Sequence, residues 1–527
     1  MKRIEANLAL DFYNSFLKYP TRPALNINKK NYDYNQLNQM ASLISDIIDK
    51  INSKNKFIAL LTNKELESYI GILGILYSGK AYMPLSKKFP TKRLLSMLDA
   101  SASEIVLVSK ESSEKLGELL PFMKKKMTFI GFDENIDNHK KRYPKHNFVY
   151  IDFRNFLNSK FKIKSIKNDD PAYLLFTSGS TGIPKGVSIS HGNVISYLKN
   201  IDKKIDFSEK DRFSQTFDLN FDLSVHDMFV CWRNGACLFA PNESDMLLPV
   251  EYIKKNKISS WFSVPSLAMI IDNYGRLTDR MFPDIRYSLF CGEALPASLA
   301  NKWSKAAPNS KLINLYGPTE ATIAISMFFY EKGKNEKDFV NGIVPIGKLF
   351  EDQSGLIINE SKNQVKDNEK GELCISGSQV TKGYLNDLNK TKSQFIKLSN
   401  NSNQLWYRTG DCVMRNDYGV YYYLNRLDNQ VKINGNRIEL GEIEHVIREI
   451  SKTDMVCVIV LSDKIKKLDQ IVAFVSGSKV DESKILFHCD TKLPKYMIPN
   501  KIKFINNMPL NINGKIDRIK LNKIVKE

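Results

Sequence analysis

The residues with the clearest chemical potential gather in one loop of the 527-residue chain. Hydroxyl side chains, glycines and a lysine stand close together there, at Thr177, Ser178, Gly179, Ser180, Thr181, Gly182 and Lys185. Glycines let backbone N–H groups turn inward around an anion. The hydroxyls add hydrogen-bond donors, and the lysine adds a positive charge. This combination predicts a polyphosphate-binding loop, with an ordinary surface loop as the alternative.

The loop differs from a Walker loop both in its sequence and in the element after it. The Gly-Lys-Ser/Thr ending is absent. Apolar runs predict a buried strand at Tyr173–Phe176 before the loop and a second strand at Val187–Ser190 after it. A Walker loop leads into a helix instead.

A second group of reactive residues is the run Tyr-Gly-Pro-Thr-Glu at 316–320. Gly317 and Pro318 predict a turn. Tyr316 offers a flat face for a base such as adenine, and Thr319 can donate to a phosphate. Glu320 is the kind of hard oxygen ligand that Mg²⁺ prefers. Helix capping by Thr319 and Glu320 is the alternative.

Three further charged residues are candidates for a functional role. Asp222 stands among apolar neighbours in the run 221–229, where a carboxylate is costly unless it meets a cation. A helix cap is the alternative for Asp222. Asp411 follows a Thr-Gly turn, where a carboxylate can accept both hydroxyls of a ribose. Lys515 lies in the loop Asn-Ile-Asn-Gly-Lys at 511–515, and an exposed loop lysine is its ordinary interpretation.

The elements that must position these residues alternate between strands and helices. Phe57–Leu61 reads as a buried strand and Glu65–Tyr77 as an apolar helix, and a helix is expected from Tyr32 to about Lys50. Such alternation is typical of α/β folds. Residues 110–168 give only weak periodicity.

These motifs, in this order from about Tyr32 to Arg518, resemble those of the adenylate-forming (ANL) superfamily. That superfamily contains acyl-CoA synthetases, luciferases and amino-acid-activating domains. The resemblance is closest to amino-acid-activating domains, including stand-alone D-alanine–carrier protein ligases. It implies an α/β fold with a large N-terminal domain of stacked mixed sheets flanked by helices, at 1–427. A small mobile α+β domain, at 428–527, would turn about a hinge at Asp428.

The resemblance also assigns roles to residues that match the family motifs. ATP would be bound by the phosphate loop together with Gly292, Asn314, Tyr316, Asp411, Tyr423 and Arg426. The catalytic residues would be Thr319, Glu320 and Lys515, with Glu320 also holding Mg²⁺. Asp222 would hold the α-ammonium of an amino acid. The substrate site would be completed by Leu223, His226, Phe262, Leu289, Cys291, Leu315, Gly317, Ile323 and Ala324. The motif at 371–384 is interpreted as structural.

The expected function is ATP-dependent activation of a small amino acid and its transfer to a phosphopantetheine thiol. The site residues are mostly apolar and bulky, and Leu223 and Cys291 resemble the residues at these positions in D-alanine ligases. This resemblance makes alanine, with its D-form included, the first expectation. Proline, serine, cysteine and valine remain alternatives. An acyl- or aryl-CoA ligase is a second candidate, which Asp222 disfavours. A catalytically inactive nucleotide-binding protein is a third, which Lys515, Glu320 and Asp411 disfavour.

The composition of the chain limits the partners and the cellular location that we expect. The formal charge is +19, from 77 basic and 58 acidic residues, but the basic clusters are short and lack interleaved aromatics, so no nucleic-acid partner is expected. Seven scattered cysteines without a C-x-x-C pair suit a reducing compartment. No apolar run is long enough to insert in a membrane, and a cytoplasmic location is expected. Because only twelve residues follow Lys515, the carrier protein is expected in trans.

Overall fold

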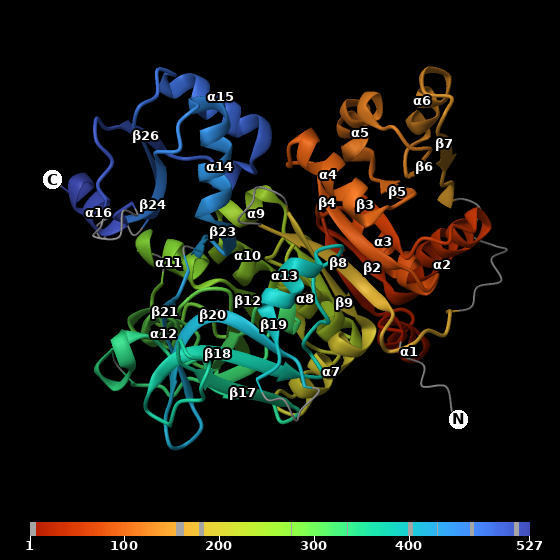
Figure 1. Ribbon diagram of the computed structural model, residues 1–527. Coiled ribbons are helices and arrows are strands. Elements are labelled where there is room, and N and C mark those ends of the chain that lie inside the picture. The colour runs from red at the N-terminus through yellow and green to blue at the C-terminus, as the bar shows by residue number, and fades with distance from the viewer. Residues whose placement is uncertain are drawn as a thin grey trace. The chain divides into compact units, whose positions relative to one another are not determined.

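The computed structural model describes residues 7–153, 163–178, 184–275, 277–334, 336–398, 404–428, 430–463, 468–510 and 516–526 (Figure 1). The chain forms two compact units. The first comprises Met1–Lys87, Leu98–Leu175 and Gly186–Leu427, and the second comprises Lys88–Met97, Phe176–Lys185 and Asp428–Glu527.

A seven-stranded sheet occupies the N-terminal part of the chain, in the order β7-β6-β5-β3-β4-β8-β9. The neighbours from β7 to β8 pair in parallel. The strands are β3 (Phe57–Thr62), β4 (Ala81–Ser86), β5 (Ile105–Val108), β6 (Thr128–Gly131), β7 (Asn147–Tyr150), β8 (Pro171–Thr177) and β9 (Lys185–Ser190). All residues of β3 and β4 are buried, which explains why these parallel strands are apolar without alternation.

A nine-stranded sheet, in the order β16-β15-β14-β13-β12-β10-β11-β1-β2, carries three of the predicted substrate residues, Phe262, Leu289 and Leu315. Its strands are β1 (Pro23–Ile27), β2 (Lys30–Asp33), β10 (Arg212–Ser214), β11 (Cys237–Ala240), β12 (Ser260–Ser263), β13 (Tyr287–Phe290), β14 (Lys311–Tyr316), β15 (Ser326–Phe329) and β16 (Lys348–Leu349). The inner strands from β1 to β14 are parallel, and β2, β15 and β16 pair antiparallel at the edges. The carboxyl ends of the parallel strands therefore lie at one edge, the usual location of ligand sites in such sheets.

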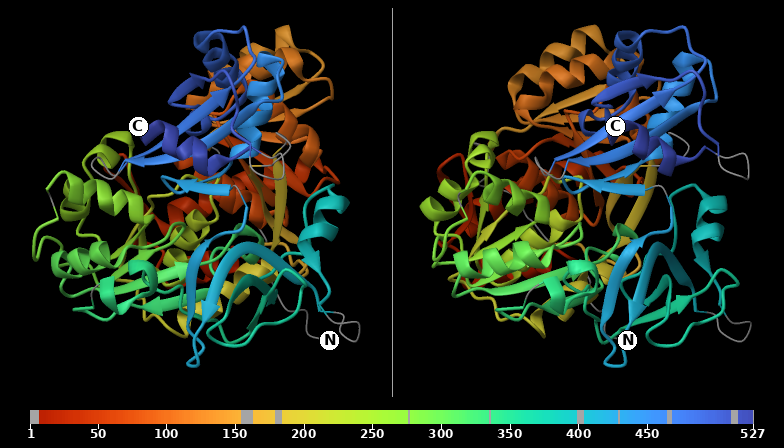
Figure 2. Two further views of the ribbon diagram at one scale, coloured as in Figure 1. Left: turned by 60° about the vertical axis from the view of Figure 1, so that its left-hand side comes forward. Right: turned by 90° about the vertical axis from the view of Figure 1, so that its left-hand side faces the viewer.

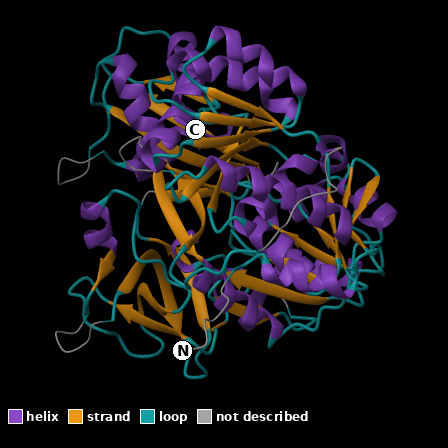
Figure 3. Cartoon of the chain, turned by 90° about the vertical axis from the view of Figure 1, so that its right-hand side faces the viewer, coloured by secondary structure: helices purple, strands orange, loops and turns teal. Residues whose placement is uncertain are grey.

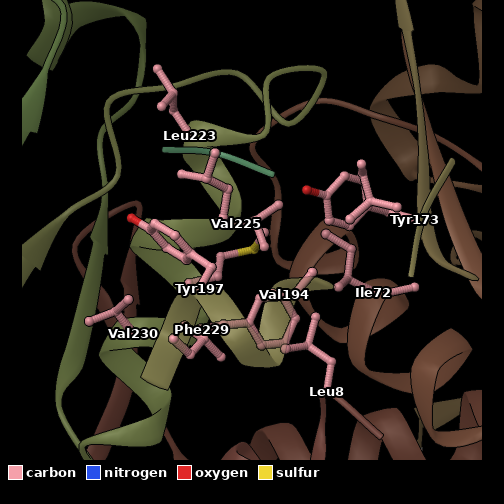
Figure 4. Close-up of a cluster of buried hydrophobic side chains, with 14 of the residues drawn as sticks. Leu8, Ile72, Tyr173, Val194, Tyr197, Leu223, Val225, Phe229 and Val230 are labelled. Atoms are coloured by element: carbon pink, nitrogen blue, oxygen red, sulfur yellow. The ribbon is translucent and has the colours of Figure 1, made fainter. Parts of the chain in front are cut away.

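Helices alternate with these strands along the chain (Figures 2 and 3). They are α1 (Leu10–Lys18), α2 (Tyr34–Ile51), α3 (Leu66–Tyr77), α4 (Thr91–Ser101), α5 (Ser113–Leu119), α6 (Asn138–Arg142), α7 (His191–Asp202), α8 (Leu223–Arg233), α9 (Glu243–Leu247), α10 (Pro249–Asn256), α11 (Pro265–Asn273) and α12 (Ala297–Ala306). Capping boxes begin α2 at Asp33 and α7 at Ser190, where side chains satisfy the first free N–H groups. Figure 4 shows one part of the core, in which labelled side chains of α3, β8, α7 and α8 pack together.

A smaller antiparallel sheet follows in the chain. Its strands are β17 (Gln353–Ile358), β18 (Lys370–Gly377), β19 (Phe395–Ile396), β20 (Trp406–Arg415) and β21 (Tyr421–Arg426), with α13 (Leu388–Gln394) between β18 and β19. The long strand β20 pairs with β18, β19 and β21.

The C-terminal segment has a two-stranded and a three-stranded sheet with its own apolar core. The elements are β22 (Gln430–Ile433), β23 (Asn436–Glu439), α14 (Leu440–Ser451), β24 (Val456–Asp463), β25 (Leu468–Val475), α15 (Glu482–Lys492), β26 (Lys501–Phe504) and α16 (Arg518–Lys526). Strand β25 pairs antiparallel with β24 and parallel with β26. Buried residues of α14, β24, β25 and α15 pack together, typical of a small α+β domain.

The predicted α/β class is confirmed. Some helix and strand boundaries differ from those expected from the sequence, for identifiable reasons. The helix expected from Tyr32 begins at Tyr34, because residues 30–33 pair with β1 and Asp33 caps the helix. Residues 110–168 contain β6 and β7, whose four-residue length gives too few side chains to establish a period. None of the seven cysteines forms a disulfide. Among the described residues, no helix is long and apolar enough to cross a membrane.

Candidate active site

Four residues predicted to line the amino-acid site occupy one face of the nine-stranded sheet. Phe262 on β12 pairs in register with Leu289 on β13, and Cys291 follows two positions later. Leu315 on β14 lies two positions after Ile313, the partner of Leu289. Paired and alternate residues of parallel strands share a face, so these side chains lie together. All are buried. Residues of opposite parity pack in a separate cluster, which includes Trp261, Phe290 and Leu312.

The N-terminus of α8 supplies the carboxylate of this site. Asp222 occupies the N-cap position, but its side chain makes no capping hydrogen bond. Its Oδ2 instead accepts a 3.0 Å hydrogen bond from the backbone N–H of Ile323. The interpretation of Asp222 as a helix cap is therefore wrong. Asp222 is 6% exposed, and its carboxylate is oriented by a residue 101 positions away in sequence.

His226 lies one helical turn after Asp222 on α8 and is fully buried. Its Nδ1 is 2.6 Å from the phenolic oxygen of Tyr197, and its ring packs edge-on against Phe262 at 4.7 Å between centroids. Burial lowers the pKa of His226 to about 3, so the imidazole is neutral at pH 7. A neutral imidazole does not supply a counter-charge for an acidic side chain.

The backbone at 322–324 forms another wall. Ile323 and Ala324 are fully buried, and Ile323 has a positive φ of 71°. Gly317 permits this arrangement, since a Cβ at position 317 would lie 2.6 Å from the Cα of Ala324. The structure thus brings Gly317 against the segment that sequence reasoning assigned to the same site.

Three residues predicted to bind the ribose and adenine meet where the last residues of β14 and β21 contact the middle of β20. The Tyr316 hydroxyl donates to Oδ2 of Asp411 at 2.5 Å, and Arg426 Nη1 donates to Oδ1 at 2.9 Å. Burial and, to a smaller extent, the neighbouring Asp411 carboxylate raise the pKa of Tyr316 well above its usual value. The phenol therefore keeps its proton and remains a hydrogen-bond donor. Tyr423, on β21, is partly buried against the main core.

Two more predicted nucleotide residues lie at the carboxyl ends of neighbouring strands. Asn314 on β14 donates from Nδ2 to the carbonyl oxygens of Val344 and Pro345, at 3.3 and 2.9 Å. Its Oδ1 is buried and accepts no hydrogen bond from the described residues. An unpaired buried acceptor costs free energy, so this oxygen is suited to a donor that a ligand supplies. Gly292, after β13, has a φ of 92°, which glycine adopts readily.

Thr319 and Glu320 begin a short 3₁₀ turn, Thr319–Ala321. Glu320 is fully buried, and Tyr384 donates to its Oε1 at 2.8 Å. Thr319 is partly buried. A carboxylate held this way is a donor of the type that Mg²⁺ prefers. Within the described ranges, no group of three or more potential metal-ligating side chains occurs.

The phosphate loop is described only at its two ends, in the second unit. Thr177 ends β8, and Ser178 donates from its hydroxyl to the carbonyl oxygen of Arg437 at 2.9 Å. Lys185 begins β9, and its Nζ lies 3.2 Å from Oε1 of Glu439. The glycine and hydroxyl residues between them lie outside the described residues, namely Gly179, Ser180, Thr181 and Gly182.

The two remaining predicted functional positions lie further along the second unit. Lys515 is also outside the described residues. Asp428 lies two positions before the first residue of β22, and its Oδ1 accepts from the backbone N–H of that residue, Gln430, at 3.1 Å.

Histidine offers no general base in this region. His191 and His226 are both buried, and burial lowers the pKa of each to about 3. His191 accepts from the backbone N–H of Leu8 at 2.9 Å, which is a structural contact.

Two residues of the site were missed by sequence reasoning. Tyr197, on α7, bonds to His226, and Tyr384, after β18, bonds to Glu320. The contacts span 29 and 64 positions, so no local pattern could have identified them.

Comparisons with known proteins place these features in a family. The family model described as AMP-binding enzyme matches residues 12–385, and the model described as AMP-binding enzyme C-terminal domain matches residues 442–515. D-alanine–D-alanyl carrier protein ligase of Bacillus licheniformis is 30% identical over 465 residues, which cover 86% of each chain. Surfactin synthase subunit 3 of Bacillus subtilis is 30% identical over 505 residues, which cover 95% of this chain and 37% of that protein.

A solved structure extends the similarity over the whole chain. The Vibrio cholerae adenylation domain AlmE, in complex with glycyl-adenosine-5'-phosphate, has a TM-score of 0.89 and 30% identity. The match covers 100% of this chain and 99% of that one. These findings confirm the family resemblance drawn from the motifs. The chain therefore belongs to the AMP-binding enzyme family of adenylate-forming enzymes, which includes amino-acid adenylation domains and amino acid–carrier protein ligases.

Proposed function

We propose that this chain uses ATP to activate a small amino acid and then transfers the aminoacyl group to the phosphopantetheine thiol of a separate carrier protein. One observation on β14 carries the proposal. Leu315 belongs to the predicted side-chain site, and the next residue, Tyr316, bonds to Asp411 of the predicted ribose site. Successive strand residues point to opposite faces. One strand end thus supports both sites, and the substrate carboxylate and the α-phosphate would meet beside it.

In the first half-reaction, a carboxylate oxygen of the amino acid attacks the α-phosphorus of ATP, and the bond to the leaving pyrophosphate breaks. Such a transfer requires positioning and charge neutralisation more than covalent protein chemistry. Asp222 would hold the α-ammonium, and Asp411 would accept the ribose hydroxyls. The unpaired Oδ1 of Asn314 suits the exocyclic amine of adenine.

The negative charge that builds at the α-phosphate needs donors and cations. Thr319 would donate to this phosphate, and Lys515 would neutralise it together with the substrate carboxylate. Lys185 and the phosphate loop would hold the terminal phosphates. Glu320, oriented by Tyr384, would hold Mg²⁺, which would supply further charge neutralisation on the phosphates.

In the second half-reaction, the carrier thiol attacks the acyl carbon, and AMP leaves. Family analogy supports a turn of a C-terminal domain, 428–527, about Asp428, which would withdraw Lys515. A channel beside Gly435 would then admit the phosphopantetheine arm. No residue of the described chain needs to act as a general base in this scheme.

The proposed substrates are very small amino acids, namely alanine, with its D-form included, and glycine. The residues around Asp222 are bulky and apolar, and His226 is neutral, so neither a charged nor a bicyclic side chain finds a partner or space. The similarity to a D-alanine–carrier protein ligase and to a glycyl-adenylate complex supports a very small side chain. A CoA ligase acting on simple acids would have no use for the buried carboxylate of Asp222.

ATP–pyrophosphate exchange tests the proposal directly. The full chain would be assayed with all proteinogenic amino acids, D-alanine, and simple acids such as acetate and benzoate. Exchange that depends on glycine or alanine supports the proposal. Exchange with simple acids alone would favour the CoA ligase, and binding of ATP without any exchange would favour an inactive nucleotide-binding protein. Incubation with a phosphopantetheinylated carrier, read by its mass increase, tests the second half-reaction.

A further inference from the structure

Two β-branched residues that follow the run Tyr316–Glu320, of which Ile323 belongs to the predicted side-chain site, have a left-handed backbone. The φ angles of Thr322 and Ile323 are 58° and 71°. This conformation is strongly disfavoured for β-branched residues and persists only where surrounding groups hold it. The strained segment matters because the N–H of Ile323 donates to Asp222, the predicted partner of the substrate ammonium. The surroundings must therefore contain a group that holds residues 321–324.

The side chain of Gln379 provides that restraint. Gln379 lies two positions after β18 and is fully buried. Its Nε2 donates to the carbonyl oxygen of Ala324 at 2.7 Å, with longer contacts of 3.3 and 3.4 Å to those of Thr322 and Ala321. In return, the Thr322 hydroxyl donates to the backbone oxygen of Gln379 at 2.6 Å. One amide thus ties both sides of the left-handed turn.

The orientation of this amide is fixed from its other end. Asn200 Nδ2 donates to Oδ1 of Asp352 at 2.7 Å and to Oε1 of Gln379 at 3.0 Å. Burial opposes ionisation of Asp352, but hydrogen bonds from Ser378, Ser196 and Asn200 outweigh it and hold its pKa well below its usual value. Asp352 is therefore ionised and only accepts hydrogen bonds, so Asn200 must present its nitrogen. Gln379 then presents oxygen to Asn200 and nitrogen to the three carbonyls.

We propose that Gln379 is a positioning residue of the amino-acid site, an inference that rests on the proposed amino-acid activation. It holds residues 321–324 in the left-handed turn, so that the N–H of Ile323 orients the Asp222 carboxylate and the side chains of Ile323 and Ala324 remain in the wall of the site. Gln379 lies in a motif whose sequence predicts only a structural role. Its effect would reach the substrate through Ile323 and Asp222.

The test replaces the amide donor without emptying the space. Gln379→Met keeps the length of the side chain but removes the donor for the three carbonyls. The matched control is Gln353→Met. Gln353 is a buried amide in the same network, where its Nε2 donates to the Ser378 hydroxyl and its Oε1 accepts from the backbone N–H of Gln379, but its hydrogen bonds within the described residues do not include the carbonyls of residues 321–324. Both variants would be compared with the wild-type chain in pyrophosphate exchange. The KM values for the amino acid and for ATP would be measured separately.

The expected result is a rise of about 10-fold or more in the KM for the amino acid with Gln379→Met, in line with loss of a buried hydrogen bond. The KM for ATP should remain within about 2-fold, and Gln353→Met should leave both values within that range. Equal changes in both KM values, or no difference between the two variants, would overturn the inference.

A crystal structure of Gln379→Met supplies a readout that is independent of activity. The distance from Ile323 N to Asp222 Oδ2, 3.0 Å in the wild type, should lengthen beyond hydrogen-bonding range. An unchanged distance would overturn the inference. If the wild-type chain exchanges pyrophosphate with no amino acid, the proposed function fails, and this distance still decides whether Gln379 holds the segment.

Discussion

The phenolic oxygen of Tyr197 lies 2.6 Å from Nδ1 of His226, and both side chains are fully buried. If the phenol donates, the imidazole carries its proton on Nε2, which has no partner among the described residues. The opposite arrangement would leave both the phenolic hydrogen and Nε2 unpaired, which costs more. Tyr197 thus fixes a neutral imidazole one helical turn from Asp222. At this position the predicted side-chain site would be closed by a rigid pair of rings rather than by a flexible residue.

This pair predicts how His226 controls substrate size. His226→Ala should enlarge the site, so that exchange with valine or leucine rises relative to exchange with glycine or alanine by about 10-fold, the usual range for one or two methylenes. Val225→Ala, a truncation of the buried residue that directly precedes His226 in α8, should leave this ratio unchanged. The ratio of kcat/KM values checks the prediction, and an unchanged ratio in His226→Ala would place His226 outside the side-chain site.

The low pKa of His226 also predicts an acid-dependent loss of stability. The folded imidazole stays neutral down to a pH of about 3, whereas the unfolded imidazole takes up a proton near its ordinary pKa of 6.5. Protonation therefore favours the unfolded chain as the pH falls through 6.5, and His226 contributes a stability that is lost between 6.5 and about 3. Burial raises the pKa of Asp227 and gives a slope of opposite sign, so the wild-type curve alone does not isolate His226.

The difference between variants isolates this contribution. Between about pH 7.5 and about pH 5.5, the stability advantage of the wild type over His226→Leu should shrink by about 1.4 kcal/mol. Val225→Ala removes buried volume but no titrating group, so its stability deficit should be the same at both pH values. Denaturant unfolding monitored by tryptophan fluorescence would measure these differences. A deficit of His226→Leu that does not change with pH would contradict the assigned environment.

Asp222 is expected to select amino acids over simple acids. In Asp222→Ala the substrate ammonium loses its counter-charge in a largely dry site. The kcat/KM for the amino acid should therefore fall by a factor that corresponds to a loss of about 2–5 kcal/mol in transition-state stabilisation. Asp218→Ala, at an exposed position four residues earlier, is the control and should retain activity. If the wild type exchanges acetate or propionate as well as it exchanges alanine, Asp222 does not have this role.

Lys515 is expected to act in adenylate formation and not in folding. Lys515→Ala should lower pyrophosphate exchange by about 10²–10³ or more, the usual effect of removing a group that stabilises a developing charge. Binding of ATP and the melting temperature should change little, because a loop lysine adds little to a core. Lys520→Ala, an exposed lysine in the following helix α16, should keep the wild-type rate. Wild-type exchange in Lys515→Ala would remove this residue from the mechanism.

The sequence by itself determined the fold class and the chemistry to expect. The phosphate loop, the run from Tyr316 to Glu320 and Asp411 are recognisable because residue type, glycine content and order are local properties of the chain. Buried strands such as β3 were predictable for a similar reason, since an apolar run of this length has few other structures open to it. The family assignment followed from these local motifs in their order.

Only the tertiary structure decided which residues hold the predicted ones in place. Asp222 is compatible with a helix cap in the local sequence, and the contact with Ile323 that excludes this interpretation joins positions 101 apart. Tyr197, Tyr384 and Gln379 carry no local signal, because each acts on a residue of another element. Pairing of β12, β13 and β14 gathers Phe262, Leu289 and Leu315 on one face. Such contacts depend on strand register and on the backbone path between elements, which side-chain patterns along the chain do not encode individually.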